Sequence, residues 1–383
     1  MKNYKLLIIA VILVAVAALV SQDNKPGAAG DPLVGHYLLS AAEIDQIRDF
    51  TLQASDEEIS VAQHNGTWRV TSRKNFAAEL DRIEDLFQKL STTRIIEMVS
   101  ANTARHNDLG VAAPASGTKP ADDCMLLTLR DKDGKPFKTL HLGKGRQSRG
   151  PDGSIGFGED GQYIRYAGTD QIYLASARLW LDRTHLRWLN TSLLKLAAAD
   201  ISRISSRPVA GADGYVLARA TATDPLQLAD LPEGQQTKSP AAAGITGFFE
   251  NLSCSDIIAT DAPLQHPDLA SATLIVVETF KGLTLSLRIG SGPVDLSGGG
   301  KGYIACLDAS YAGTDPALTA LASETAGNAR NFVYAIQEAR VKPLLAKPAE
   351  LHEPKPAPPP PEAASGTIAA PASASAPVEP ATD

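Results

Sequence analysis

The sequence predicts an α+β protein of two similar modules, each an antiparallel-rich sheet with a helix packed on one face, after an N-terminal membrane helix. Three observations support this prediction. The chain begins with an apolar run, its body holds strands that alternate apolar and polar residues around glycine turns, and one helix-to-strand phrase occurs twice. The copies are "LFQKLSTTRIIE" at 86–97 and "FFENLSCSDIIA" at 248–259. Their shared positions are Phe87, Leu90, Ser91, Ile95 and Ile96 in the first copy, and Phe249, Leu252, Ser253, Ile257 and Ile258 in the second.

The N-terminus carries Lys2 and Lys5 and then an uninterrupted apolar run from Leu6 to Val20. This run of 15 residues is shorter than the ~17 to 25 of most spanning helices, so flanking polar residues must be drawn in at the interfaces. A cleaved signal peptide has the same charged start but prefers small residues at its cleavage site. Because "AVAALVSQ" offers only a weak site, we favour a retained anchor over a cleaved signal.

Both alternatives export the rest of the chain, and the lysines keep the first residues in the cytoplasm. We therefore expect a single-pass protein of the bacterial inner membrane, which contacts the membrane through residues 4–22 and has its C-terminal body in the periplasm. Residues 1–22 form the anchor or signal, and 23–39, with their glycines and prolines, form a tether.

The first α+β module is predicted over residues 40–195. Its helix places Leu80, Ile83, Phe87 and Leu90 at steps of three and four, which predicts one apolar face packed on a sheet. Asn-Gly and Asp-Gly turns divide the alternating segments into hairpins. The expected elements are strands within 44–53 and 57–70, a helix over 77–90, and hairpins over 124–144 and 161–176.

The second module, 196–312, repeats this order and is interpreted as an internal repeat. Strands are expected in 199–208 and 213–220, a helix ends in the second copy of the phrase, and a hairpin turns at Lys281-Gly282. A final amphipathic helix is expected over 313–345. The remaining segment, 346–383, is rich in Pro and Ala without an apolar period, which predicts a disordered tail.

The cysteines and two tryptophans are interpreted as core residues. Cys124, Cys254 and Cys306 are an odd count for an oxidising compartment, so at most one disulfide forms within the chain. Each is expected to be a small buried side chain. Trp180 and Trp188 are expected to pack in the segment that closes the first module.

Several functional classes are disfavoured by the residues. The net charge is -7 with scattered Lys and Arg, so no basic stripe is present to bind nucleic acid. The stretch "SGGGKGY" at 297–303 lacks the Gly-Lys-Ser/Thr of a phosphate loop, so we expect no nucleotide. The seven histidines do not fall at metal-site spacings. We expect no cofactor, no metal and no catalytic residue, and hence not an enzyme.

A glycine-rich stretch at 142–161 carries Lys144, Arg146 and Arg149. A basic glycine loop binds an anionic headgroup or glycan in some proteins, but the tip of a hairpin has the same composition. These three side chains are possible ligand contacts. Phe87, Leu90, Phe249 and Leu252 are instead assigned to the structural core.

In the order of its motifs the chain resembles a bacterial family, that of the domain of unknown function 4340. The likeness covers about 40–205 most clearly, through "NGTWRV", "ELDRIEDLFQKLSTTRII", "DLGV", "LHLGK", "GQYIRYAGTDQIYLAS" and "RWLNTSLLKLAAADISRI". The resemblance implies a membrane-anchored extracytoplasmic protein, considered alongside gliding-type ABC transport systems as an auxiliary component. The resemblance supplies no catalytic residues that could be carried over to this chain.

Three functional hypotheses follow. The leading one is a non-catalytic, membrane-tethered periplasmic scaffold or accessory subunit in a membrane protein complex, serving an ABC-type export or envelope system. The second is a module that binds envelope glycan or another polyanion through the basic glycine loop and the junction between modules. The third is an unrecognised hydrolase, for which a deep pocket with convergent perturbed carboxylates would be needed.

Overall fold

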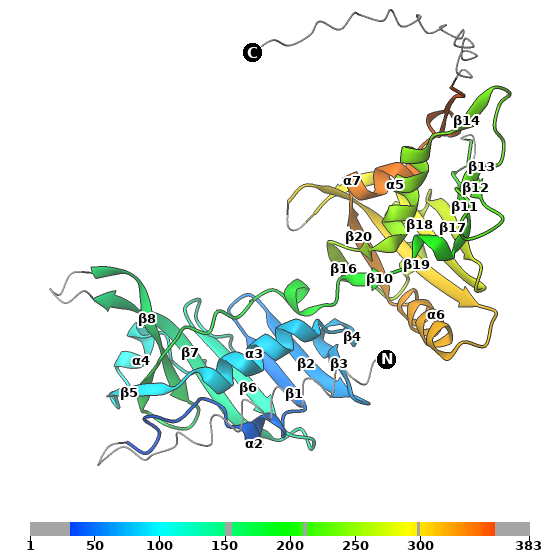
Figure 1. Ribbon diagram of the computed structural model, residues 1–383. Coiled ribbons are helices and arrows are strands. Elements are labelled where there is room, and N and C mark those ends of the chain that lie inside the picture. The colour runs from blue at the N-terminus through cyan, green and yellow to red at the C-terminus, as the bar shows by residue number, and fades with distance from the viewer. Residues whose placement is uncertain (1–30, 150–154, 210–212, 297–298, 357–383) are drawn as a thin grey trace, which may run out of the picture.

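The computed structural model describes residues 31–149, 155–209, 213–296 and 299–356. Within these ranges the chain forms two large antiparallel sheets, each with a helix on one face, which is an α+β architecture (Figure 1). None of the helices in these ranges is both long and apolar enough to span a membrane. The predicted anchor, 1–22, lies outside the described residues.

The first sheet has nine strands in the order β4-β3-β2-β1-β6-β7-β8-β9-β5, and all neighbouring strands are antiparallel. Short helical turns, α2 (Ala41–Ile44) and α4 (Arg105–Asp108), lie outside it. The strands are β1 (Asp49–Gln53), β2 (Glu58–His64), β3 (Thr67–Val70), β4 (Phe76–Ala77), β5 (Ile95–Ser100), β6 (Met125–Arg130), β7 (Pro136–Arg149), β8 (Ile155–Tyr166) and β9 (Ile172–Ala175).

Helix α3 (Leu80–Thr92) covers one face of this sheet because its apolar residues recur at helical spacing. Phe87 and Leu90 are buried in the core, and the ring of Phe87 meets that of Phe50 at 6.1 Å between centroids. The predicted apolar stripe is wrong at Leu80, which is 42% exposed. Leu80 is the first residue of the helix and lies beyond the edge of the packed face.

The second sheet has eight strands in the order β13-β12-β11-β17-β18-β19-β20-β16, with α5 (Ser239–Glu250) on one face. Phe249 and Leu252 are fully buried there. The strands are β11 (Ile201–Arg207), β12 (Val216–Ala218), β13 (Gln227–Leu228), β16 (Asp256–Ala259), β17 (Thr273–Thr279), β18 (Leu283–Asp295), β19 (Lys301–Tyr311) and β20 (Phe332–Gln337). Two small ladders pair β10 (Ser192–Leu194) with β15 (Leu252–Ser253), and β14 (Gln235–Thr237) with β21 (His352–Pro354).

Both sheets place their strands in the same order. In each, the first three strands form a meander, and the later hairpin strands follow beside the first strand of that meander. The far edge is closed by a strand that comes after the covering helix: β5 directly follows α3, and β16 follows α5 after the short strand β15. Ile95 begins β5 after α3, and Ile257 lies in β16 after α5. The aromatic and the paired isoleucines of the repeated phrase therefore lie in corresponding elements of the two sheets. The middle of the phrase does not, since Leu90 lies in α3 and Leu252 lies in β15, after the end of α5.

The predicted helix over 313–345 is wrong in its second half. Helix α6 (Pro316–Asn328) starts at its Asp315 cap, but the chain then enters strand β20, followed by α7 (Glu338–Val341). The five residues of β20 from Phe332 to Ile336 are all buried. A continuous apolar run of this length is typical of a strand between two others, and β20 lies between β19 and β16.

Two segments that were predicted to lie outside the modules, one near each end of the chain, are folded in the described structure. Part of the expected tether, 31–39, is folded onto the first sheet, where Leu38 and Leu39 are buried. At the other end, Leu351 is 1% exposed and β21 pairs with β14. The expected tail, 346–383, is therefore wrong up to Pro356, and 357–383 lies outside the described residues.

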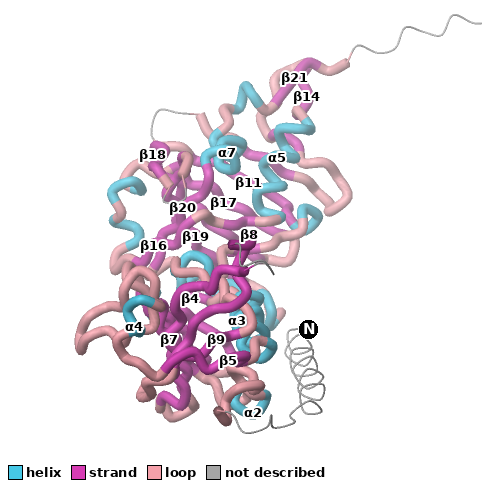
Figure 2. The backbone as a smooth tube through the Cα atoms, turned by 90° about the vertical axis from the view of Figure 1, so that its left-hand side faces the viewer, coloured by secondary structure: helices cyan, strands magenta, loops and turns pink. Residues whose placement is uncertain are grey.

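The two sheets share one continuous hydrophobic core. At their junction the ring of Phe76 in β4 meets the ring of Phe332 in β20 at 4.9 Å between centroids. Two ion pairs flank this contact, Lys74 with Asp261 at 2.5 Å and Arg69 with Glu324 at 3.1 Å. The second sheet lies above the first in Figure 2, and the described chain enters beside the first and leaves from β21 at the far end of the second.

Candidate functional site

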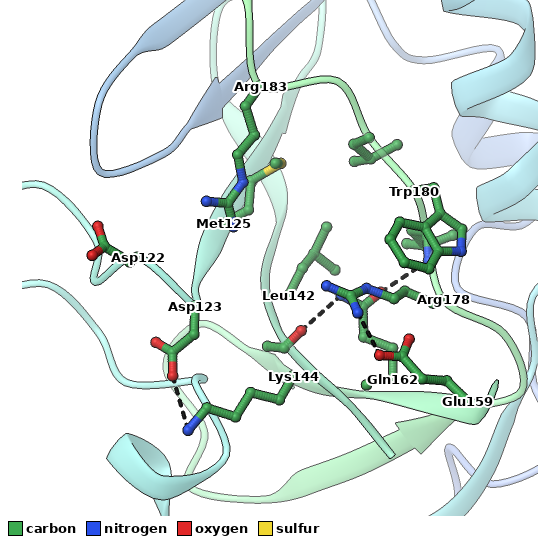
Figure 3. Close-up of a pocket in the computed structure, with 14 residues that line it drawn as sticks. Asp122, Asp123, Met125, Leu142, Lys144, Glu159, Gln162, Arg178, Trp180 and Arg183 are labelled. Atoms are coloured by element: carbon green, nitrogen blue, oxygen red, sulfur yellow. Dashed lines mark hydrogen bonds and ion pairs between the residues drawn. The ribbon is translucent and has the colours of Figure 1, made fainter. Parts of the chain in front are cut away.

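A cavity of about 400 Å³ opens beside the β7–β8 hairpin, where the coil after β9 crosses the end of the first sheet (Figure 3). Its floor is apolar, its rim carries charges of both signs, and one large aromatic side chain stands beside it. The lining residues are Asp122, Asp123, Met125, Leu142, Gly143, Lys144, Gly145, Glu159, Gln162, Arg178, Leu179, Trp180, Leu181 and Arg183.

Close packing of the hairpin shapes the cavity. A Cβ on Gly143 would lie 2.3 Å from the carbonyl oxygen of Leu109, so only glycine allows this approach. The buried Gln162 side chain donates from Nε2 to the Gly143 carbonyl at 2.9 Å and accepts from the Leu179 amide at 2.9 Å. Gln162 therefore ties the crossing coil to the hairpin and fixes the position of the residues that follow.

Trp180 is 67% exposed, which corrects the prediction that it packs in the segment closing the first module; Trp188 is buried there as predicted. Its neighbour Leu179 is buried, and the extended coil turns alternate side chains to opposite sides, so Trp180 points outward. The guanidinium of Arg178 lies over the indole ring, 4.2 Å from its centroid, and is held by an ion pair to Glu159 at 2.5 Å. Arg178 thus covers one face of the indole ring and holds the ring in position.

The basic side chains of the cavity differ in their partners. Lys144 forms an ion pair with Asp123 at 3.0 Å, and Arg178 is paired with Glu159. Arg183 is half-buried, and within the described ranges its guanidinium has no hydrogen bond or ion pair. Arg183 therefore supplies the one positive charge of this cavity that the described residues do not neutralise.

The three predicted ligand contacts do not converge on this cavity. Lys144 lines it, whereas Arg146 turns to Glu97 and Asp160, at 2.8 and 2.7 Å. The Arg146 guanidinium lowers the pKa of the Asp160 carboxyl, and the hydrogen bond to that carboxylate raises the pKa of Arg146. Arg149 ends β7, and its side chain lies outside the described part of the chain.

Sequence reasoning missed Trp180 and Arg183 as site residues. The sequence signal for an outward tryptophan is the period-two pattern of "RLWLDR". Leu179 and Leu181 pack against the core, whereas Trp180 between them turns outward. A single arginine in a coil carries no comparable signal. Its role depends on which carboxylates the fold brings near it.

A second cavity, of about 610 Å³, lies at the junction between the sheets and is lined by Glu79, Arg82, Arg187 and Cys254 among others. Arg82 and Arg187 both face Asp182, at 3.7 and 3.8 Å. Burial raises the pKa of the Cys254 thiol to about 12. This thiol stays protonated at neutral pH and is a poor nucleophile.

All three cysteines are free and buried in the described structure. No cluster of three or more His, Cys, Asp or Glu residues within these ranges is arranged to hold a metal ion. The glycine stretch at 297–303 begins outside the described residues, and from Lys301 it continues as strand β19.

Comparison with protein families gives one match. The family model described as "Domain of unknown function (DUF4340)" matches residues 68–271, which run from β3 of the first sheet into the second sheet. Searches of curated proteins and of solved structures found no match.

Proposed function

This chain belongs to the DUF4340 family, and from that premise we propose that it is a non-catalytic, membrane-tethered scaffold or accessory subunit in the bacterial periplasm, serving an ABC-type export or envelope system. The anchor proposed for residues 1–22 would attach the protein to the membrane. We further propose that the two sheets are an internal repeat, because their strand orders agree and Phe87 and Phe249 are buried in corresponding helices.

The open edge of β5 is the observation that best supports an accessory role. At the start of this strand the outer edge is paired, since Gly35 donates to the Ile95 carbonyl at 2.7 Å and Ile95 to the His36 carbonyl at 2.9 Å. Beyond Ile95, no backbone hydrogen bond joins this outer edge to another segment of the described chain. Ile96 and Met98 on this stretch are each 44% exposed.

An open edge strand with exposed apolar side chains accepts an extended segment of a partner as an additional strand. The one charge on β5, Glu97, is already neutralised by Arg146 at 2.8 Å and does not repel a partner strand. No lysine or proline lies on the strand to block pairing. We therefore assign the partner-binding surface to the outer edge of β5 from Ile96 to Ser100.

The position of this edge fits a partner in the membrane. The described chain begins at Asp31, whose carboxylate accepts a hydrogen bond from Tyr173 in β9, the strand beside β5. If the anchor ends near Gln22, the chain from there to Asp31 spans at most about 32 Å. The β5 edge then lies within reach of the periplasmic loops of a membrane protein.

Affinity purification of the full-length protein from membranes in mild detergent tests the proposal. We expect ABC-type membrane subunits to co-purify, and Met98→Lys to remove them because a lysine on the edge opposes strand addition. Leu264→Lys, at an apolar residue that is 61% exposed in the second module, is the matched control and should retain them. If Met98→Lys retains the same partners, the β5 edge is not the partner-binding surface. If no membrane subunit co-purifies with the wild type, the accessory role is excluded.

A further inference from the structure

We propose that the cavity beside Trp180 binds a saccharide unit that bears a carboxylate. This binding site goes beyond the accessory role and does not depend on the anchor or on the β5 edge. It rests on three features of the cavity: its size, the exposed aromatic ring, and the guanidinium of Arg183, which no described residue pairs.

The volume fits a small ligand. At about 400 Å³ the cavity falls within the range of about 300 to 1,000 Å³ that is typical of small-molecule sites. Met125 and Leu142 form an apolar floor, while carboxylates of Asp122, Asp123 and Glu159 stand around it. Carboxylate oxygens accept hydrogen bonds from hydroxyl groups, which a sugar ring presents around its edge.

Trp180 provides a stacking surface. An indole ring that is 67% exposed leaves a large apolar face in water, and covering it is favourable. Arg178 lies over one face of the ring and is itself fixed by Glu159, so the ring is held in place before any ligand arrives. The C–H groups on one face of a pyranose pack well against such a surface, and the hydroxyl groups then point to the polar rim.

Arg183 determines the charge of the ligand. In Figure 3 its side chain reaches over Met125 toward the space that Arg178 and Lys144 border. Because Arg178 and Lys144 are neutralised within the cavity, Arg183 is the guanidinium left for a ligand anion. A guanidinium pairs with a carboxylate through two parallel hydrogen bonds. One carboxylate on the sugar would therefore pair with the Arg183 guanidinium.

The opposing charge is Asp122, which is exposed on the rim. Its carboxylate disfavours a ligand with several negative charges and favours one that directs a hydroxyl toward this side. The cavity is therefore suited to a sugar with one acidic substituent and not to a general polyanion.

Matched pairs of sugars test the proposal on the full-length protein in detergent solution. N-acetylmuramic acid is compared with N-acetylglucosamine, and galacturonic acid with galactose, by titration calorimetry and tryptophan fluorescence. Trp188 is buried and Trp68 is partly buried against the core, so the exposed Trp180 is the tryptophan that a ligand in this cavity covers, and its emission should shift to shorter wavelength. We expect the acidic member of at least one pair to bind about tenfold more tightly than its neutral partner. A response to N-acetylmuramic acid alone indicates a cell-wall amino sugar, and a response to galacturonic acid indicates a uronic acid polysaccharide.

Variants separate the two contacts. Arg183→Gln should remove the preference for the acid while the neutral sugar binds as before, and Trp180→Ala should weaken both. Arg187→Gln, at an exposed arginine outside this cavity, is the control and should change neither. Equal melting temperatures of the variants show that the fold is intact.

Three results would overturn the proposal: no binding of any of the four sugars, equal binding of acid and neutral partner, or an unchanged preference in Arg183→Gln. Binding of citrate as tightly as the acidic sugar would also overturn it, because charge alone would then account for recognition.

Discussion

Acidification below neutral pH should destabilise the first sheet through His141. This side chain is 3% exposed and lies directly opposite Arg165 in the β7–β8 ladder. Burial lowers the pKa of His141 to about 4, and the positive charge of Arg165 acts in the same direction. Arg165 is itself buried and donates from Nε to the Val111 carbonyl at 2.8 Å, so it holds the covering segment in place and cannot turn away.

The size of this destabilisation follows from the difference between the pKa of His141 in the unfolded chain and in the folded protein. In the unfolded chain a histidine titrates near its ordinary value of about 6.5, so below that pH the unfolded state binds a proton that the folded state does not bind until about pH 4. The free energy of unfolding therefore falls as the pH falls from 6.5 to 4. A difference of two to three units between the pKa values of the unfolded and folded states lowers the free energy of unfolding by about 3 kcal/mol.

Urea unfolding between pH 7.5 and 4 measures this effect in the wild type and in His141→Gln. The variant keeps a polar side chain of similar length and removes the titrating group. We expect the stability of the wild type to fall by about 3 kcal/mol more than that of the variant across this range. Parallel stability curves for the two proteins would refute the assigned pKa and the role of Arg165 in lowering it.

Three further predictions concern the core and the two chain ends. Phe87→Ala and Phe249→Ala should each lower the free energy of unfolding by about 3 to 5 kcal/mol because each leaves a cavity, whereas the exposed Glu84→Ala should be near neutral by the same denaturation assay. A chain that stops after Lys347 loses the buried Leu351 and β21 and should melt a few degrees lower than one that stops after Pro356, measured by calorimetry; equal melting temperatures would show that β21 adds nothing. The intact mass of the mature protein should include the apolar run, and a start at or beyond Ser21 would contradict the retained anchor.

Periodicity predicted the elements whose burial is one-sided. Helix α3 was predictable because Ile83, Phe87 and Leu90 recur at helical spacing against charged residues on the other face. The β6–β7 hairpin was predictable because its strands alternate around Asp133-Gly134. Strand β20 was not, because a short apolar run that is buried on both faces has no period to distinguish it from a helix.

The candidate site was predicted less well than the fold. A basic glycine loop indicated Lys144, Arg146 and Arg149, but ion pairing depends on which strands lie side by side. The fold brings Glu97 and Asp160 to Arg146 and leaves Arg183 with no ionic partner in the described chain. Composition cannot show this difference, since Arg146 and Arg183 are the same residue type and only the fold places carboxylates beside Arg146.

A photo-crosslinking amino acid placed at Met98 in the full-length protein, in intact cells, tests the proposed accessory role most directly. The same group at Leu264 is the control, because Leu264 is more exposed but lies outside the β5 edge. We predict a crosslinked product with a membrane protein at Met98 and none at Leu264. Crosslinking at Met98 to no protein, or to the same proteins as at Leu264, would contradict the proposal that this edge joins the chain to a membrane complex.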